Sequence, residues 1–174
     1  VRGAGGRAAA YDEGCLVVDL IMPAADSMTG VQARFSAEAE LQARALRGLG
    51  VDARVGEVPG EYCPGEFSVN ARGKTKLIGA AQRIVRGAWL LSSVVVVEPA
   101  AQLRAVLEDV YGELGLDWDP ATTGSVADEV PAVTTDAVSD ALLAQYAQDT
   151  TLVPVTLSAP ELAAANDVIA RYRV

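Results

Sequence analysis

The stretch "FSVNARGKTKLIGAAQR" (residues 67–83) predicts a β-hairpin, and the expected fold is built outward from it. "FSVN" and "KLIGAAQ" supply the two strands, and "ARGKT" supplies a turn that contains a glycine. The stretch also holds both lysines of the chain, Lys74 and Lys76, whereas the other twelve basic residues are arginines. This placement suggests that a compact ammonium is needed here rather than a planar guanidinium.

Further strands are predicted on both sides of the hairpin. Before it, a short apolar run closed by proline and a stretch of alternating polarity both fit strands. After it, a run rich in valine and leucine fits another. These strands are expected at residues 15–23, 51–58 and 87–97, and "PGEYCPGE" (residues 59–66), with two Pro-Gly pairs, is expected to form a turn.

Helices are predicted between the strands and in the second half of the chain. Residues 30–49 are rich in good helix formers and end near a glycine. A second helix has one apolar face, formed by Leu103, Val106, Leu107, Val110 and Leu114. Thr135 is expected to cap a helix that runs to about Gln148, and "SAPE" (residues 158–161) has capping-box spacing before a last helix.

The order of these elements predicts an α+β fold, with helices packed on a mixed, largely antiparallel sheet. Residues 117–133 are expected to form a loop, and no linker or repeat divides residues 1–174, so a single domain is expected. A domain of this length can bury about two thirds of the surface that its unfolded chain exposes. A substantial hydrophobic core is therefore predicted.

Composition and charge disfavour several classes of function. The net charge of −9 argues against nucleic-acid binding, which relies on clustered lysine and arginine. The longest apolar run, residues 87–97, is shorter than the roughly 20 residues that a membrane-spanning helix needs. Two cysteines do not form a disulfide framework, so a reducing cytoplasm is expected. With no histidine in the chain, neither a Ser-His-Asp triad nor a histidine metal site can be built, and no metal ligand is predicted.

Glycines and arginines are concentrated in the opening stretch "RGAGGRAAAYDEG" (residues 2–14). Glycine lets the backbone approach a ligand closely, and the flanking arginines suit a phosphate or a carboxylate. The same composition also fits a plain flexible turn. It does not form a Walker phosphate loop, because no Gly-Lys-Ser or Gly-Lys-Thr closes it at the required spacing.

Two motifs in this order resemble signatures of a known family. Arg2, Gly5-Gly6, Ala8, Tyr11 and Asp12 are similar to Arg-x-Ser-Gly-Gly-Gly-Ala-x-x-His-Asp. "KLIGAAQR" (residues 76–83) is similar to Lys-x-x-Gly-x-Ala-Gln-Arg. Both are signatures of the lipoate protein ligase and octanoyltransferase family, the lipoyl-attaching relatives of biotin protein ligases, and the resemblance covers roughly residues 1–114. A biotin ligase is disfavoured, because the glycine motif lacks the charged and aromatic pattern of that group.

The resemblance implies an enzyme with a biotin/lipoate ligase-like catalytic domain. It implies that lipoate or octanoate is attached to a lysine of a lipoyl carrier domain, in a 2-oxoacid dehydrogenase or a glycine cleavage protein. Lys76 would contact the acyl carbonyl or phosphate as the catalytic lysine, whereas Lys74 matches nothing in the motif and is expected to be exposed. The expected substrate-binding residues are Arg2, Gly5, Gly6, Arg7, Tyr11, Gly79 and Gln82.

The sequence also departs from the family pattern. Tyr11 stands where the family usually has histidine, Ala4 replaces serine or threonine, and Arg7 often replaces glycine. Ser92 and Ser93 lie near the place where many members have His-Gly. Family members carry strands and a helix before the glycine motif, so the resemblance predicts an N-terminally truncated domain with an incomplete pocket.

Three mechanisms remain open at this point. The leading expectation is a ligase that uses ATP and Mg²⁺ to form an acyl-adenylate. The alternative is an octanoyltransferase that needs no cofactor and carries octanoate on Cys63, in "GEYCPGE", as a thioester. Thiolates are strong nucleophiles, and Lys76 could supply the neighbouring cation, whereas Cys15, at the head of an apolar strand, is expected to lie in the core. The third possibility is a non-catalytic relative that binds an acyl group or a carrier.

Overall fold

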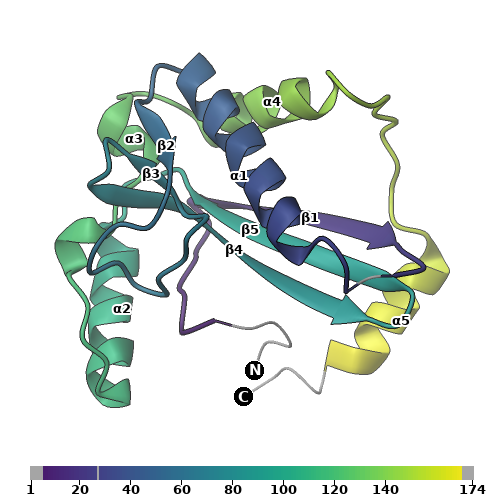
Figure 1. Cartoon of the computed structure of the whole chain (residues 1–174), viewed down its shortest axis with the longest axis horizontal. Helices are drawn as coiled ribbons and strands as arrows, with labels where there is room; N and C mark the ends of the chain where they lie inside the picture. Colours follow the sequence, from purple (N-terminus) through teal and green to yellow (C-terminus); the bar gives the residue numbers. More distant parts are fainter. Residues whose placement is uncertain (1–5, 27, 170–174) are drawn as a thin grey trace.

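The computed structural model describes residues 6–26 and 28–169 and contains a five-stranded sheet in the order β1-β5-β4-β3-β2 (Figure 1). Every pairing between these strands is antiparallel, and one isolated parallel bridge joins Lys76 to Thr123. The strands are β1 (Cys15–Pro23), β2 (Ala53–Val55), β3 (Val69–Ala71), β4 (Thr75–Val85) and β5 (Ala88–Val96). The predicted α+β class with a largely antiparallel sheet is thus confirmed.

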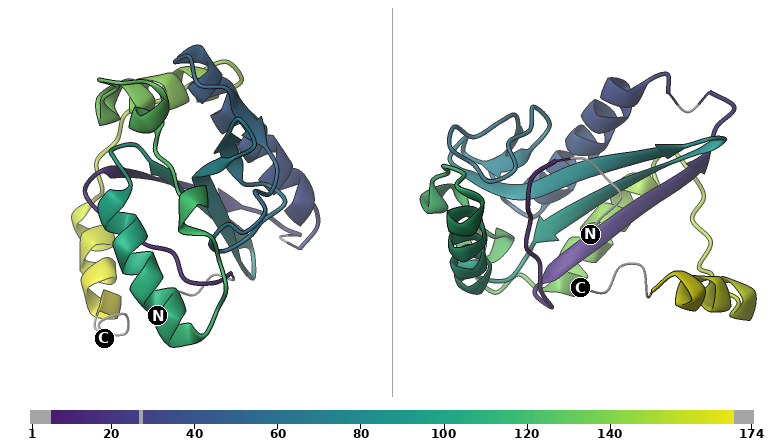
Figure 2. Two further views of the ribbon diagram at one scale, coloured as in Figure 1. Left: turned by 90° about the vertical axis from the view of Figure 1, so that its left-hand side faces the viewer. Right: turned by 90° about the horizontal axis from the view of Figure 1, so that it is seen from below.

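Helices surround this sheet unevenly. Helices α1 and α4 pack against each other on one face, α2 stands near the end where β5 stops, and α5 lies at the opposite end (Figures 1 and 2). Their bounds are α1 (Val31–Gly48), α2 (Ala101–Leu114), the 3-10 helix η1 (Pro120–Thr122), α3 (Val126–Glu129), α4 (Thr135–Tyr146) and α5 (Ala159–Ile169). No helix in the described part of the chain is long and apolar enough to cross a membrane.

The hairpin predicted from residues 67–83 is formed by β3 and β4. Arg72 and Gly73 both have positive φ, 57° and 72°, and the Lys74 amide donates to the Ala71 carbonyl at 2.9 Å. Two central residues with positive φ make a type I′ turn, whose twist matches that of the strands it joins. The connection is therefore tighter than the predicted loop, and the strands extend to Ala71 and Thr75.

The β3 strand is much shorter than β4. Its pairs with β4 end at Val69 and Ile78, so the edge of β4 from Gly79 onward faces no described strand on that side. The other edge of β4 remains paired with β5 from Ile78 to Val85. This half-free strand provides the edge around which the candidate site is built.

The main hydrophobic core lies between the sheet and the pair α1–α4. It contains the buried side chains Ala39, Ala43, Ala45, Leu46, Val51, Ala53, Val69, Ala71, Leu77, Ile78, Val95, Val97, Val126, Val138 and Leu142. The Tyr146 hydroxyl of α4 donates to the Glu38 carboxylate of α1, and Gln42 donates to the same oxygen at 2.7 Å. These hydrogen bonds hold the two helices over the end of the sheet that contains β2, β3 and the first residues of β4.

Three predicted boundaries were wrong. The loop expected at residues 117–133 contains η1 and α3, and the α3 cap is a reciprocal capping box between Ser125 and Asp128. The cap of α4 is Thr134, whose hydroxyl accepts from the Ala137 amide, rather than Thr135. The strand expected at residues 51–58 is only three residues long, because the backbone turns away at Gly56, where φ is 147°.

Candidate active site

Lys76 lies near the start of β4 with only 2% of its surface exposed. Its Nζ donates to the carbonyl oxygens of Cys63, at 2.8 Å, and Tyr62, at 3.2 Å, and lies 4.9 Å from the centre of the Tyr62 ring. Glu61 provides the counter-charge, with its Oε1 3.5 Å from Nζ. Burial lowers the pKa of Lys76, and the Glu61 carboxylate opposes that shift because it favours the charged ammonium.

Glu61 organises the loop that carries Cys63. Its side chain is fully buried, and Oε1 accepts hydrogen bonds from the Gly65 amide at 2.8 Å and the Ser68 hydroxyl at 2.7 Å. The other oxygen, Oε2, is buried without a hydrogen-bond partner among the described residues. One carboxylate therefore folds residues 61–68 back on themselves and also holds the ammonium of Lys76.

Cys63 occupies a conformation that is uncommon for a residue with a side chain, with φ at 42°. Its Sγ accepts a hydrogen bond from the Arg7 amide at 3.1 Å, and its own amide donates to the Tyr111 hydroxyl at 2.7 Å. Tyr111, on α2 and fully buried, donates in turn to the Ala8 carbonyl at 3.0 Å. The Tyr111 hydroxyl thus ties the segment after the opening glycines to the cysteine loop.

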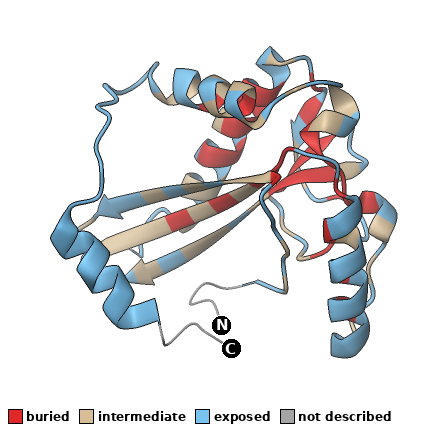
Figure 3. Ribbon diagram, turned by 180° about the vertical axis from the view of Figure 1, so that it is seen from behind, coloured by how far each residue is buried: buried red, intermediate tan, exposed pale blue. Residues whose placement is uncertain are grey.

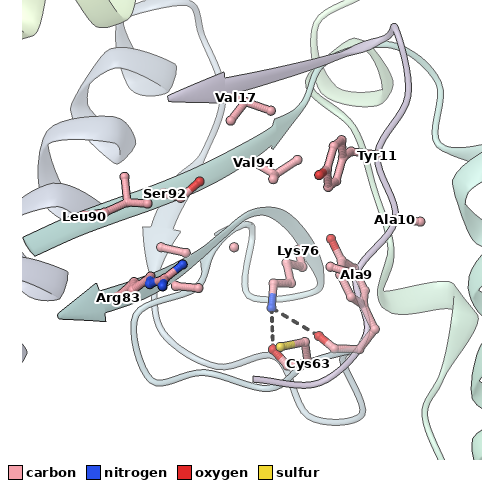
Figure 4. Close-up of a pocket in the computed structure, with 14 residues that line it drawn as sticks. Ala9, Ala10, Tyr11, Val17, Cys63, Lys76, Arg83, Leu90, Ser92 and Val94 are labelled. Carbon is pink, nitrogen blue, oxygen red and sulfur yellow. Dashed lines mark hydrogen bonds between the residues drawn. The ribbon is translucent and has the colours of Figure 1, made fainter. Parts of the chain in front are cut away.

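A first cavity of about 230 Å³ opens in front of these residues (Figure 4). Gly79 gives Lys76 its space there, because a Cβ at that position would lie 3.0 Å from the lysine Cε. The cavity extends along the sheet, between β4, alternate residues of β5, one residue of β1 and the segment before β1. Its lining consists of Ala9, Ala10, Tyr11, Val17, Tyr62, Cys63, Lys76, Gly79, Ala80, Ala81, Arg83, Leu90, Ser92 and Val94.

A second cavity, of about 450 Å³, lies beside the free edge of β4. One of its walls is the first turn of α1, and the other is the loop after Cys63. The rings of Phe35 and Phe67 stack across it with their centres 5.9 Å apart. Its full lining consists of Gly6, Val31, Gln32, Phe35, Cys63, Pro64, Gly65, Glu66, Phe67, Ser68, Lys76, Ala80, Ala81, Gln82 and Ile84.

Most of the predicted site residues gather around these two cavities. Gly6 lines the second cavity with a φ of 98°, and Tyr11 lines the first with 62% of its surface exposed. Arg7 contributes its amide to Cys63. Gln82 lines the second cavity, accepts from Arg34 at 2.9 Å and donates to the Val31 carbonyl at 3.1 Å, so it also anchors α1 to β4.

Other sequence predictions fall outside the site. Arg2 and Gly5 lie outside the described residues. Lys74 is exposed on the hairpin turn, as expected. Cys15 is half-buried rather than a core residue, with its Sγ 3.7 Å from an Asp12 oxygen, and burial raises the pKa of its thiol. No group of three or more metal-ligating side chains occurs within residues 6–26 and 28–169.

Sequence reasoning missed Glu61 and Tyr111. Glu61 stands between two Pro-Gly pairs, where a charged residue normally faces solvent. Tyr111 is one more aromatic residue in an amphipathic helix. The one available signal for Tyr111 is its position on the same helical face as Leu103 and Leu107, which predicts burial, and a buried tyrosine hydroxyl usually finds a partner.

Comparison with known proteins places this arrangement among lipoyl-attaching enzymes. The family model of the lipoyl protein ligase A/B catalytic domain matches residues 1–147. The "Octanoyl-[GcvH]:protein N-octanoyltransferase" of Geobacillus kaustophilus is 33% identical over 133 residues, which cover 76% of this chain and 46% of that protein. The enzyme of the same name from Anoxybacillus flavithermus is 37% identical over 105 residues, covering 60% and 37%. The chain thus spans less than half the length of these curated relatives.

Solved structures share the fold. Lipoate-protein ligase A bound with ATP superimposes with a TM-score of 0.78 at 24% identity, over 98% of this chain and 66% of that one. A putative lipoate protein ligase from Thermoplasma acidophilum with bound lipoic acid gives a TM-score of 0.75 at 22% identity, with the same coverage. Together with the match of the family model, the fold and the two motifs lead to one conclusion: the chain belongs to the lipoyl protein ligase A/B catalytic domain family, whose members are ligases and transferases.

Proposed function

We propose that this chain transfers octanoyl groups to lysine residues of lipoyl carrier proteins through a thioester on Cys63. The observation that carries the proposal is the meeting of Cys63 and Lys76 at the junction of the two cavities. A nucleophile and a cation are thereby placed where an acyl group and an amine can both reach them. The curated relatives, which are named as octanoyltransferases, support this choice over an ATP-dependent ligase.

The first half-reaction loads the enzyme. The Cys63 sulfur attacks the carbonyl carbon of the octanoyl donor, a C–S bond forms, and the bond to the donor's amine or thiol breaks as that group takes the proton. The Arg7 amide donates a hydrogen bond to Sγ and so helps to orient the sulfur. The Lys76 ammonium stabilises the negative charge that develops on the carbonyl oxygen, and a buried cation does this more strongly than one in water.

The second half-reaction releases the acyl group to the acceptor. A neutral lysine amine attacks the thioester carbon, the C–N bond forms, and the C–S bond breaks as the amine proton returns to the thiol. No nucleotide is consumed, because the acyl group passes from the donor to the acceptor lysine without being released as a free acid that would need activation. The relatives' name places the octanoyl group on GcvH at the start, so the donor in the proposal is the octanoylated glycine cleavage carrier and the acceptor is the carrier domain of a 2-oxoacid dehydrogenase.

The test is acylation of the full chain by an octanoyl donor, followed by intact-protein and peptide mass spectrometry, with and without ATP. We expect one octanoyl group on the Cys63 peptide in the absence of ATP, and its transfer to an unmodified lipoyl carrier. Cys63→Ser should abolish loading and transfer. Cys15→Ser is the matched control and should load normally, since its sulfur lines neither cavity.

Three outcomes would count against the proposal. Strict dependence on ATP with free octanoate or lipoate, together with full activity of Cys63→Ser, would identify an acyl-adenylate ligase. Binding of a carrier or of octanoate without any turnover would identify a non-catalytic relative. Loading on Cys15 instead of Cys63 would leave the transferase class but remove the proposed nucleophile.

A further inference from the structure

The two cavities meet at Cys63 but share few residues. Only Cys63, Lys76, Ala80 and Ala81 line both of them. Ala80 and Ala81 belong to the part of β4 whose outer edge faces no described strand. A thioester on Cys63 would therefore be open to two separate spaces, one along the sheet and one around the edge of β4.

The first cavity suits an apolar chain. It follows β4 from Gly79 to Arg83, a length of about 13 Å for four strand residues. Val17, Leu90 and Val94 provide apolar walls, and Figure 4 shows Leu90 and Arg83 at the end remote from Cys63. Arg83 is the charged residue at this remote end, and no carboxylate among the described residues lines the first cavity.

The second cavity has a different character. The stacked rings of Phe35 and Phe67 offer apolar surface, while exposed Gln32 and Glu66 stand at its rim. Glu66 is the carboxylate in its lining. A lysine side chain combines an apolar four-carbon stem with a terminal ammonium. The aromatic rings suit the apolar stem, and the Glu66 carboxylate suits the ammonium.

We infer that the second cavity admits the substrate lysine of the carrier protein, while the acyl chain stays in the first cavity. This inference rests on the proposed transferase function and adds to it the route by which the amine reaches the thioester. Glu66 attracts the ammonium at the rim, and the Phe35 and Phe67 rings pack against the stem. The substrate ammonium releases one proton to solvent as it approaches the Lys76 ammonium, because two like charges in a buried site disfavour each other.

The same route serves the donor. When octanoyl-lysine of one carrier loads Cys63, the C–N bond breaks and the freed lysine takes the thiol proton and leaves through the second cavity. The acceptor lysine then enters by the same path, its nitrogen bonds to the acyl carbon, the C–S bond breaks, and the amine proton returns to the sulfur. The acyl chain remains in the first cavity throughout.

The two roles can be separated with a small donor that carries no lysine. In the full chain, S-octanoyl-N-acetylcysteamine loads Cys63, and an unmodified lipoyl carrier domain of a 2-oxoacid dehydrogenase is then added in a single turnover. Gln32→Trp fills the rim of the second cavity from an exposed position of α1. We expect loading within twofold of the wild-type rate and transfer to the carrier at least tenfold slower.

Three further variants make the test specific. Gln102→Trp, at an exposed position of α2, is the matched control and should change neither step. Val94→Phe, in the first cavity, should slow loading by octanoyl at least tenfold but leave loading by the acetyl analogue within twofold. Glu66→Gln should raise the KM for the carrier severalfold with little change in kcat.

Hydroxylamine provides a second control, because this amine is small enough to need no channel. It should release the acyl group from Gln32→Trp at the wild-type rate.

Two results would overturn the inference. Transfer to the carrier at the wild-type rate by Gln32→Trp would show that the lysine enters elsewhere. Slow octanoyl loading of Gln32→Trp with normal loading of Val94→Phe would place the acyl chain in the second cavity. A wild-type chain that loads no octanoyl group on Cys63 would instead remove the proposed function itself, and the inference with it.

Discussion

The two ends of the central sheet differ sharply in how they are covered. At one end, Leu77, Val95 and Val97 are completely buried under α1, α4 and the connecting loops. At the other end, Val85, which shares β4 with Leu77, is 47% exposed, and Ile21 of β1 is 70% exposed, although both lie in equally apolar stretches (Figure 3). Lys76 lies in the packed end of β4, and Gly79 begins the open end.

The contrast suits the chemistry that we propose at this boundary. A buried ammonium needs neighbours that hold its acceptors in place, and the packed end supplies Glu61 and the carbonyls of the cysteine loop. An acyl chain and an incoming amine need space, and the open end supplies it beyond Gly79. A fully packed sheet would have no room for substrate, and a fully open one would leave Lys76 without a fixed position.

The largest effect is expected from removing the cation at this boundary. Lys76→Met should lower octanoyl transfer at least 100-fold, roughly the effect of losing one oxyanion-stabilising group. It should also cost about 3–5 kcal/mol in the free energy of unfolding, because Glu61 remains buried without its partner. Single-turnover kinetics and urea denaturation measure the two effects.

A double variant separates catalysis from stability. Lys76→Met combined with Glu61→Gln removes both buried charges and should recover most of the lost stability without recovering transfer. Lys76→Arg should also stay inactive, because the wide guanidinium does not fit the space left by Gly79. Wild-type transfer by the stable double variant would show that Lys76 is structural only.

The second prediction compares the sheet ends directly. Leu77→Ala leaves a hole in the packed end and should cost about 2–5 kcal/mol of unfolding free energy. Ile21→Ala, at the open end, should change it by less than about 0.5 kcal/mol. Equal losses in chemical denaturation would mean that Ile21 is covered in solution and that the contrast between the ends is false.

The third prediction concerns pH. Burial already lowers the pKa of Lys76, while Glu61, Cys63 and Glu57 raise it. Replacing Glu61 by glutamine should therefore lower the pKa of Lys76 further. The pH above which the rate of Cys63 loading falls should then move to a lower value. Because a lysine with a lowered pKa binds fewer protons when folded than when unfolded, stability should rise with pH between its folded and ordinary pKa values.

Glutamine is a close match for Glu61 here, since its oxygen can still accept from Gly65 and Ser68, and its amide nitrogen replaces the oxygen that lacks a partner. Glu108→Gln is the control for charge alone, because Glu108 is exposed on α2 and lines neither cavity. An unchanged pH profile in Glu61→Gln would contradict a role for the pair in holding the charge of Lys76.

The smallest effect is expected at the boundary glycine. A Cβ at residue 79 would lie 3.0 Å from the lysine Cε, so Gly79→Ala should displace Lys76 by a few tenths of an ångström. We expect octanoyl transfer to fall severalfold with little loss of stability, as measured by single-turnover rate and melting temperature. Gly112→Ala, in open space on α2, should leave the rate unchanged. A rate for Gly79→Ala equal to that of wild type would show that Lys76 tolerates this shift.

Elements with strong local patterns were predictable from the sequence. The strand predicted at residues 15–23 has the same bounds as β1, and the predicted helices correspond to α1, α2, α4 and α5. The short elements η1 and α3 were missed, because a single turn is stabilised mainly by contacts outside it. In α3, for example, the Ala127 amide donates to the Val97 carbonyl. The Ser125–Asp128 capping spacing was the one local sign of α3.

The site was predictable only where a motif marks it. Lys76 and Gly79 were singled out because residues 76–83 resemble a family motif, and both line the first cavity, whereas the exposure of Lys74 follows from its place in a turn. The burial of Lys76 could not be predicted, because it depends on Glu61 being folded inward by Gly65 and Ser68. Contacts of this kind join residues that have no periodic relation in the sequence.

The small number of residues shared by the two cavities has a consequence for how such an enzyme can diversify. Substitutions at Leu90 or Val94 alter one space, and substitutions at Gln32 or Phe35 alter the other, without touching Cys63. Under the proposed mechanism, preference for acyl chain length and preference for the receiving protein could therefore evolve, or be engineered, one at a time.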